Sequence, residues 1–231
     1  MVSERIDPLL LLTNKIQQGF ARQLQTIGVF FDLEKAYDTT WRHGIIKQLH
    51  KLGIKGNMIR FISDFLCDRY IKVRVGNKIS SAYKQEEGVP QGSVLSVTCF
   101  ALAINCIVDQ ISPPVMGSLF VDDFAIYITG YDASELCRHL QKSIDAVSKW
   151  ANNNGFKFST SKTVAVRFTR STRQETVPVL KLNGEIIPYD NTVKFLGMTF
   201  DSKLTWSSHI DTLKTKVKKS LNILKVVTGF N

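Results

Sequence analysis

The chain has 231 residues, a length that allows one sizeable hydrophobic core or two small ones. Its formal net charge is +10 and its sequence pI is near 9.5, and this positive charge suits a partner rich in phosphate. The longest apolar run near the start, Leu9 to Leu12, is too short to cross a membrane, and no secretory signal is visible. The four cysteines lack metal-binding spacing, so we expect an intracellular protein of the nucleus, the cytoplasm or both, with no membrane partner.

The first expected element is an amphipathic helix over Pro8–Leu24, with Asp7 as its N-cap and the proline in its first turn. The apolar run Ile27–Phe31 follows, and it is typical of a buried strand. Asp32 comes directly after this run, at the carboxyl end of the expected strand. The residues after Asp32 turn polar and lead toward a helix.

Two helical patterns then cover residues 43–52 and 57–66, and residues 70–83 alternate like two strands around a turn. The loop Glu87–Ser93 contains a proline, which fixes one backbone angle, and glycines, which permit turns and close approach of the backbone to a ligand. Ser93 is placed to cap an apolar helix over Val94–Val108. An ordinary loop entering a helix is the alternative interpretation.

Two adjacent acids, Asp122 and Asp123, lie between short apolar segments within residues 119–128, which predicts a tight turn with a strand on either side. Neighbouring like charges are unfavourable without compensation, and Mg²⁺ supplies it, because it binds carboxylate oxygens and substrate phosphates. Taken alone, the Asp122-Asp123 pair fits a solvated hairpin tip better than it fits a metal site. If the strand before Asp32 pairs beside this hairpin, Asp32 and Asp122 can hold two metal ions for in-line phosphoryl transfer.

The second half of the chain predicts a helix over residues 132–152 and strands over 164–168, 179–182 and 185–188, with a hairpin turn at Asn183-Gly184. A last helix over residues 207–226 has an apolar stripe and many lysines. Its lysines indicate either a solvated face of a packing helix or a nucleic-acid contact. This order of elements predicts an α+β fold in which helices back an antiparallel sheet.

The motifs "FFDLEKAYD", "EGVPQGSVLS", "FVDD" and "KFLG", in this order, resemble the successive palm motifs of a reverse transcriptase. The nearer resemblance is to non-LTR retrotransposons of the jockey or LINE type, which "WRHGIIKQLHKLGI", "FLCDRYIKVRVGN" and "LTWSSHI" share. The resemblance implies a polymerase palm over residues 26–200 with a finger-like insertion at about 53–85. Residues 1–25 would be an N-terminal helix left from shortened fingers, and residues 201–231 the start of a thumb.

The resemblance also implies roles for single residues. Asp32, Asp122 and Asp123 would be the catalytic acids, and Asp32, Asp122 and the Leu33 carbonyl would hold two Mg²⁺ ions, or Mn²⁺ in their place. Tyr37 would lie beneath the sugar of the incoming nucleotide and clash with a 2′-hydroxyl, although a core or partly exposed tyrosine is the alternative. The other implied contacts to nucleotide, template and pyrophosphate are Gln91, Gly92 and Lys162, and the implied primer grip is Phe195, Leu196 and Gly197.

The implied function is RNA-directed DNA synthesis, with an RNA template, a DNA primer and deoxynucleoside triphosphates as partners. Substitutions at Val97, Cys106, Val121 and Thr160 depart from the family pattern without removing an acid, and the fingers ahead of Asp32 are short. The alternative is therefore an inactive truncated relic that keeps the palm fold and at most binds nucleic acid. A two-metal nucleotidyl cyclase is a weaker third hypothesis, because the Gln91 loop and the "KFLG" segment argue against it.

Overall fold

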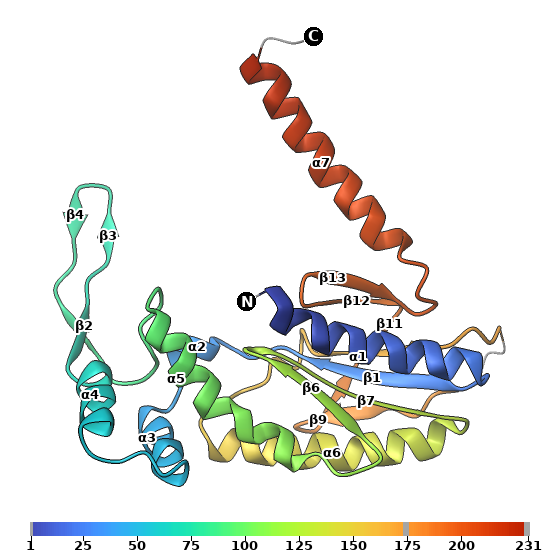
Figure 1. Ribbon diagram of the computed structural model, residues 1–231, viewed down its shortest axis with the longest axis horizontal. Helices are drawn as coiled ribbons and strands as arrows, with labels where there is room; N and C mark the ends of the chain where they lie inside the picture. The colour runs from blue at the N-terminus through green and yellow to red at the C-terminus, as the bar shows by residue number, and fades with distance from the viewer. Residues whose placement is uncertain (1, 173–175, 229–231) are drawn as a thin grey trace.

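A five-stranded sheet lies at the centre of the computed structural model, which describes residues 2–172 and 176–228 (Figure 1). The strand order is β11-β8-β1-β7-β6, and every neighbouring pair is antiparallel except β8 with β11. The predicted α+β fold with an antiparallel sheet backed by helices is therefore confirmed. The strands of this sheet are β1 Gln25–Phe31, β6 Met116–Phe120, β7 Asp123–Gly130, β8 Val164–Phe168 and β11 Tyr189–Asp190.

Strand β1 is buried on both faces of the sheet. Every one of its residues is buried, as expected for a continuous apolar run in a central strand. Because side chains alternate along a strand, Ile27, Val29 and Phe31 enter one apolar cluster and Phe30 enters the other. The sheet therefore separates two hydrophobic layers, and helices have to cover both.

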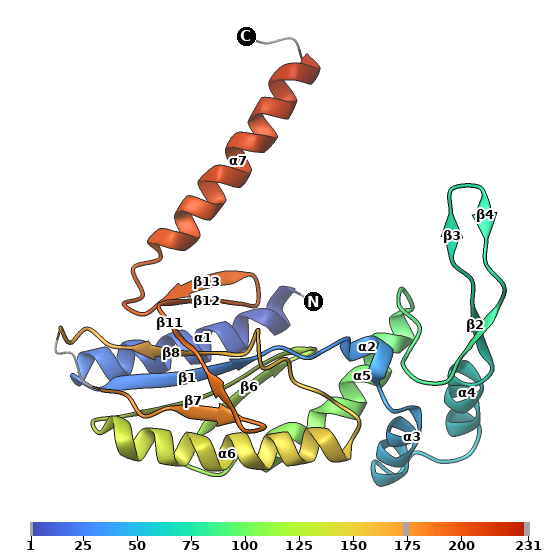
Figure 2. The ribbon, with the colours of Figure 1, turned by 180° about the vertical axis from the view of Figure 1, so that it is seen from behind.

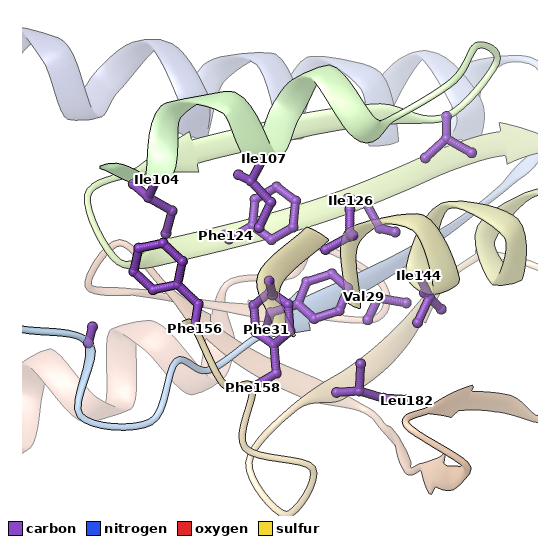
Figure 3. Packing of buried hydrophobic residues seen from close by; sticks show 14 of the residues in the cluster. Val29, Phe31, Ile104, Ile107, Phe124, Ile126, Ile144, Phe156, Phe158 and Leu182 are labelled. Carbon is purple, nitrogen blue, oxygen red and sulfur yellow. The ribbon is translucent and has the colours of Figure 1, made fainter. Parts of the chain in front are cut away.

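The first layer lies between the sheet and helices α5 (Val94–Ile104) and α6 (Ala133–Asn153) (Figure 3). Helix α6 presents an apolar stripe to the sheet, and Asp132 caps it by accepting a hydrogen bond from the Ser134 N–H at 2.9 Å. The apolar helix expected over 94–108 is shorter than predicted. It ends at Ile104 and continues as the 3₁₀ helix η1, Asn105–Gln110.

The second layer lies between the sheet and helix α1, Val2–Ala21, together with the β12–β13 hairpin. Leu12 and Ile16 of α1 are fully buried in it. The predicted start of this helix was wrong, because α1 begins before Asp7 and holds Pro8 in its interior. Asp7 is therefore not an N-cap. The early residues include the good helix formers Glu and Arg, so the helix extends past the proline that suggested its start.

Three helices and a projecting hairpin lie between β1 and α5 (Figure 1). The helices expected over 43–52 and 57–66 are confirmed within a residue of their bounds. The expected pair of strands over 70–83 is present, but it is interrupted in the middle and forms two short ladders. The elements are α2 Ala36–Thr39, α3 Arg42–Lys51, α4 Asn57–Leu66, β2 Arg69–Ile71, β3 Arg74–Val75, β4 Lys78–Ile79 and β5 Tyr83–Gln85.

Two further hairpins and a long helix complete the fold. Asn183 and Gly184 form the predicted turn, and both have the positive φ that such a two-residue turn requires. Helix α7 extends away from the sheet, on the same side as the projecting hairpin (Figures 1 and 2). No helix in the described part of the chain is long and apolar enough to span a bilayer. These elements are β9 Leu180–Leu182, β10 Glu185–Ile187, β12 Thr192–Phe195, β13 Met198–Asp201 and α7 Ser207–Thr228.

Candidate active site

The three predicted acids reach one end of the central sheet. Strand β1 ends at Phe31, which pairs with Phe124 of β7, so the register continues from Asp32 toward Asp123. The β6–β7 hairpin closes at Asp123, and Asp122 lies exposed in the two-residue turn before it. The predicted turn and its two strands are present, although of the two acids only Asp122 lies in the turn, because Asp123 already pairs with Phe120 as the first residue of β7. Strand β1 pairs beside them as the metal hypothesis requires.

An aromatic cluster supports these acids from below. The Phe31 ring stacks on Phe124 at 5.1 Å between centroids, and it meets Phe158 at 4.8 Å. All three side chains are buried (Figure 3). Because each ring is next in sequence to a polar residue of the site, close packing of the rings fixes the backbone from which Asp32 and Asp123 project.

The acids do not form a preformed metal cluster. Within residues 2–172 and 176–228, no three Asp, Glu, His or Cys side chains lie close enough together to hold a metal ion. One oxygen is nevertheless suited to a cation, since Oδ2 of Asp32 is buried and accepts no hydrogen bond from the described residues. The Asp32 side chain as a whole is 41% exposed, so the rest of its carboxyl group remains open to solvent.

Lys162 lies beside Asp32 because the segment after α6 runs along the end of β1. The Ser159 N–H donates to the Asp32 carbonyl at 2.8 Å, and the Asp32 N–H donates to the Thr163 hydroxyl at 3.4 Å. The Lys162 ammonium consequently lies 3.5 Å from Oδ2 of Asp32. Lys162 is 71% exposed, so solvent screens this ion pair and it contributes little to stability.

A pocket of about 610 Å³ adjoins the acids, a volume in the range of small-molecule sites. The structure therefore brings together residues that are far apart in the sequence, from the end of β1, the loop before α5 and the β6–β7 turn. Lys162, Asp32 and Asp123 do not line this pocket. Its lining includes the predicted site residues Leu33, Tyr37, Gln91, Gly92 and Asp122.

Tyr37 forms part of the pocket wall and is fixed by stacking. Its ring lies 4.9 Å from that of Phe100, with 21° between the ring planes. Burial raises the pKa of the Tyr37 phenol, and the negative charge of Asp122 raises that pKa further. The phenol therefore lies within the field of the exposed acid at the hairpin turn. The side chain is partly buried and packs against the core, so the alternative of a core or partly exposed tyrosine stays open beside the sugar contact.

The loop before α5 docks on the segment that carries Tyr37. The Val89 N–H donates to the Tyr37 carbonyl at 2.8 Å, and the Gly88 N–H donates to the Thr40 carbonyl at 2.9 Å. The Gln91 amide donates to the Asp38 carboxylate at 2.9 Å. These bonds set the position of Gln91 at the pocket. The expected cap by Ser93 is wrong in one respect, because this residue occupies the N-cap position but its side chain makes no capping hydrogen bond.

Comparison with known proteins agrees with this geometry. The family described as reverse transcriptase (RNA-dependent DNA polymerase) matches residues 4–200. The chain belongs to the reverse transcriptase family. The expected resemblance to jockey-type elements is confirmed, because the RNA-directed DNA polymerase from mobile element jockey of Drosophila melanogaster is 29% identical over 203 residues. The probable RNA-directed DNA polymerase from transposon BS of the same species is also 29% identical, over 205 residues.

These alignments cover 84% and 86% of this reverse transcriptase chain but only 22% of each relative, so the chain spans about a fifth of their length. Among solved structures, the apo telomerase from Candida tropicalis, truncated from its C-terminal domain, superposes with a TM-score of 0.60 at 15% identity. That superposition covers 90% of this chain and 39% of the telomerase chain. The likeness is one of fold, and it agrees with a polymerase palm.

One residue that organises the site was not among the predicted site residues of this reverse transcriptase chain. Arg42, at the start of α3, donates hydrogen bonds to the carbonyls of Gln85, Glu87 and Gly88 at 2.7, 2.9 and 2.7 Å. Burial lowers the pKa of its guanidinium, although an arginine remains a cation in a protein. Arg42 thus ties the base of the projecting hairpin to the pocket loop. Only its place in the family-like segment "WRHGIIKQLHKLGI" hinted at a role.

The predicted primer-grip residues form the tight turn between β12 and β13 and do not line the pocket. The Phe195 side chain is 2% exposed, and its ring packs edge-on against Phe30 at 5.5 Å. Leu196 is also buried, whereas Gly197 is exposed. Phe195 and Leu196 therefore hold the hairpin on the sheet, and the backbone around Gly197 is the part that faces solvent.

Proposed function

We propose that this chain is the catalytic domain of a non-LTR retrotransposon reverse transcriptase, which extends a DNA primer on an RNA template with deoxynucleoside triphosphates. The observation that carries the proposal is the pocket between Tyr37, the Gln91 loop and Asp122, beside the end of β1. A nucleotide bound there would have carboxylates at one end and an aromatic ring in its wall. Family membership and the palm-like fold support the same function.

Reverse transcriptases generally use divalent metal ions, and we propose that Mg²⁺ serves here as a pair of ions that Mn²⁺ can replace. The residues proposed to hold them are Asp32, Asp122 and the Leu33 carbonyl. These hard oxygen donors suit Mg²⁺, and the buried Oδ2 of Asp32, which accepts no hydrogen bond and has the Lys162 ammonium at 3.5 Å, is an oxygen that a closer cation would satisfy. When bound, Mg²⁺ supplies charge stabilisation for transfer of a phosphoryl group.

The reaction joins the primer 3′-hydroxyl to the α-phosphate of the nucleotide and releases pyrophosphate. Tyr37, held by its stack on Phe100, would exclude a 2′-hydroxyl from the sugar position. Gln91, oriented by Asp38, would contact the nucleotide and the template together with Gly92. The exposed Lys162 would exchange its partner Asp32 for the phosphate charge. Asp123 would be the second acid of the pair.

The division of the chain follows from the same proposal. Residues 1–25 would be the remnant of the fingers, residues 26–200 the palm with an insertion at about 53–85, and residues 201–231 the start of the thumb. Phe195, Leu196 and Gly197 would form the primer grip at the edge of the palm. Met1 and residues 229–231, which belong to the first and last of these parts, lie outside the described residues.

The decisive experiment compares wild-type protein with Asp122→Asn in primer extension on an RNA template with Mg²⁺. Asp122 is exposed in a turn, so its replacement leaves both hydrophobic layers intact, and we expect normal folding by circular dichroism without extension. Asp109→Asn, which removes an exposed carboxylate from η1, is the matched control and should extend like wild type. Comparable extension by Asp122→Asn would refute the assignment.

A relic without turnover is the second candidate function, and the absence of a three-residue metal cluster within the described residues favours it. Such a protein would keep the fold and bind nucleic acid only. Wild-type protein that binds RNA but gives no extension with either Mg²⁺ or Mn²⁺ would establish this candidate and exclude the first.

A further inference from the structure

The hairpin between α4 and the pocket loop has an unusual composition. Residues 69–85, which we call the basic hairpin, contain five basic side chains and no acidic one, so this segment carries half of the net charge of +10. It stands clear of the central sheet in both views (Figures 1 and 2). Its cations therefore form a concentrated positive feature. They are Arg69, Lys72, Arg74, Lys78 and Lys84.

Large apolar side chains are interleaved with these cations and are equally open to solvent. Tyr70 is 62% exposed and Tyr83 is 59% exposed, and every residue from 71 to 79 is exposed. None of these side chains serves a hydrophobic core of the described structure, since neither cluster includes them. Exposed apolar groups gathered on one element mark an interaction surface rather than a packing requirement.

The basic hairpin is held in shape before any partner arrives. In the β2–β5 ladder, Tyr70 lies opposite Lys84 and Ile71 lies opposite Tyr83. Where the two ladders meet, Ser80 bonds to both backbone groups of Val73, accepting from its N–H and donating to its carbonyl, each at 2.9 Å. A prearranged surface loses less entropy on binding, so affinity does not require this segment to fold first.

We infer that the basic hairpin binds single-stranded nucleic acid, with its cations on phosphates and bases stacked on Tyr70 or on Tyr83, which the ladder register places on opposite faces. Aromatic rings interleaved with cations are the combination that tracks an unpaired strand, because each base offers a face for stacking. A protein that adds a strand to the hairpin edge fits less well, since the four strands are only two or three residues long. Acids flank the base of the hairpin, where Asp68 pairs with Lys84 at 3.1 Å, but residues 69–85 contain none, so the charge toward the tip is that of Lys72, Arg74 and Lys78 and agrees with a phosphate-rich partner.

The hairpin is also linked to the pocket. Arg42 holds the carbonyl of Gln85, the last residue of β5, together with the carbonyls of Glu87 and Gly88 in the pocket loop. A strand bound on the basic hairpin is therefore bound on an element rigidly joined to the loop that carries Gln91. The binding itself needs no catalysis, so it is tested without metal or nucleotides and separately from the proposed polymerase activity.

The test is fluorescence anisotropy with labelled RNA and DNA oligonucleotides of the same sequence and about 16 nucleotides, the upper site size of a single-strand binding fold. We expect Tyr70→Ala and Tyr83→Ala to weaken binding by about 5- to 140-fold for each base that loses its stack. Lys72→Gln combined with Lys78→Gln should reduce the slope of log affinity against log salt by about 1.4, because each lost phosphate contact accounts for about 0.7.

The matched control is Lys142→Gln with Lys149→Gln, which removes the same charge from exposed positions on α6, on the other side of the sheet from α1. It should keep the wild-type affinity, and so should Asp122→Asn even if that variant cannot extend a primer. Photocrosslinking of wild-type protein to halogenated oligonucleotides should place the crosslinks at Tyr70 or Tyr83. The inference is supported if RNA, DNA or both lose affinity for the hairpin variants and crosslink at Tyr70 or Tyr83.

The inference is overturned by hairpin variants that bind like wild type, by crosslinks found only outside residues 69–85, or by equal competition from an unlabelled duplex. A change in oligomeric state in the hairpin variants without a change in oligonucleotide affinity would also overturn it, by identifying a protein contact instead.

Discussion

Replacement of Gly88 by alanine tests whether the pocket loop is held as closely as the structure requires. Gly88 has a φ of +79°, and a Cβ built there would lie 2.5 Å from the Asp38 carbonyl oxygen and 2.7 Å from that of Tyr37. Both obstacles are backbone atoms, so neither can turn aside as a side chain would. The loop must therefore move away from the segment that carries Tyr37.

The expected cost has two parts. An L-residue at positive φ costs about 1–2 kcal/mol, and forcing an extra carbon into a closely packed contact costs about 1–3 kcal/mol more. Gly88→Ala should therefore lower the free energy of unfolding by about 2–5 kcal/mol. Gly53 provides a matched control, because its φ is +78° and nothing lies within 4 Å of a Cβ built there. Gly53→Ala should lower the free energy of unfolding only by the cost of an L-residue at positive φ, about 1–2 kcal/mol.

The assay is urea unfolding of both variants, followed by tryptophan fluorescence and analysed by linear extrapolation. Gly88→Ala should unfold at the lower midpoint, and it should also need more nucleotide for half-maximal extension, since the same loop carries Gln91. If the two glycine variants agree within about 0.5 kcal/mol, the close contact with Tyr37 and Asp38 is not present in solution and the description of the pocket wall is wrong.

Two further predictions concern Arg42 and Asp201. Arg42→Lys keeps the charge but loses the planar set of donors that reaches three carbonyls. We therefore expect the free energy of unfolding in urea to fall by about 1–3 kcal/mol, and KM to change more than kcat. A variant as stable as wild type would contradict this. Burial opposes ionisation of Asp201, but hydrogen bonds from the N–H groups of Thr205, Trp206 and Lys203 outweigh it and lower its pKa. The carboxylate therefore stabilises the protein above its ordinary pKa of 3.8, and this advantage over Asp201→Asn should disappear as the pH falls through the lowered value. An advantage that persists in acid would contradict that account.

The elements that sequence predicts well are those whose signal is local and strong. The apolar run before Asp32 is buried on both faces and can hardly be anything but a central strand. Asn183-Gly184 specifies its turn by backbone conformation alone. The stripe on α6 and the cap at Asp132 define both the face and the start of that helix. In each case one short segment contains the physical cause of its own structure.

What sequence could not supply depends on contacts between distant segments. The bonds from Arg42 to carbonyls more than forty positions away use only backbone atoms of the partner, which leave no mark on residue type. The ion pair between Lys162 and Asp32 follows from the path of the chain after α6. The burial of Phe195 and Leu196 depends on how their hairpin docks over the sheet. The roles that the family motifs imply for Asp32, Lys162, Phe195 and Leu196 remain predictions.

The two metal-binding candidates differ in how firmly the chain supports them. Asp32 extends from a strand hydrogen-bonded on both sides and buried on both faces, whose amides should be among the slowest in the protein to exchange with deuterium. Asp122 is carried by the reverse turn of the β6–β7 hairpin, in which its own side chain is exposed while Val121 packs partly buried against the core. Cation binding would thus chiefly immobilise the second carboxylate. The entropic penalty of assembling the centre should accordingly fall on the Val121-Asp122 peptide, where isotope exchange would slow most on addition of Mg²⁺.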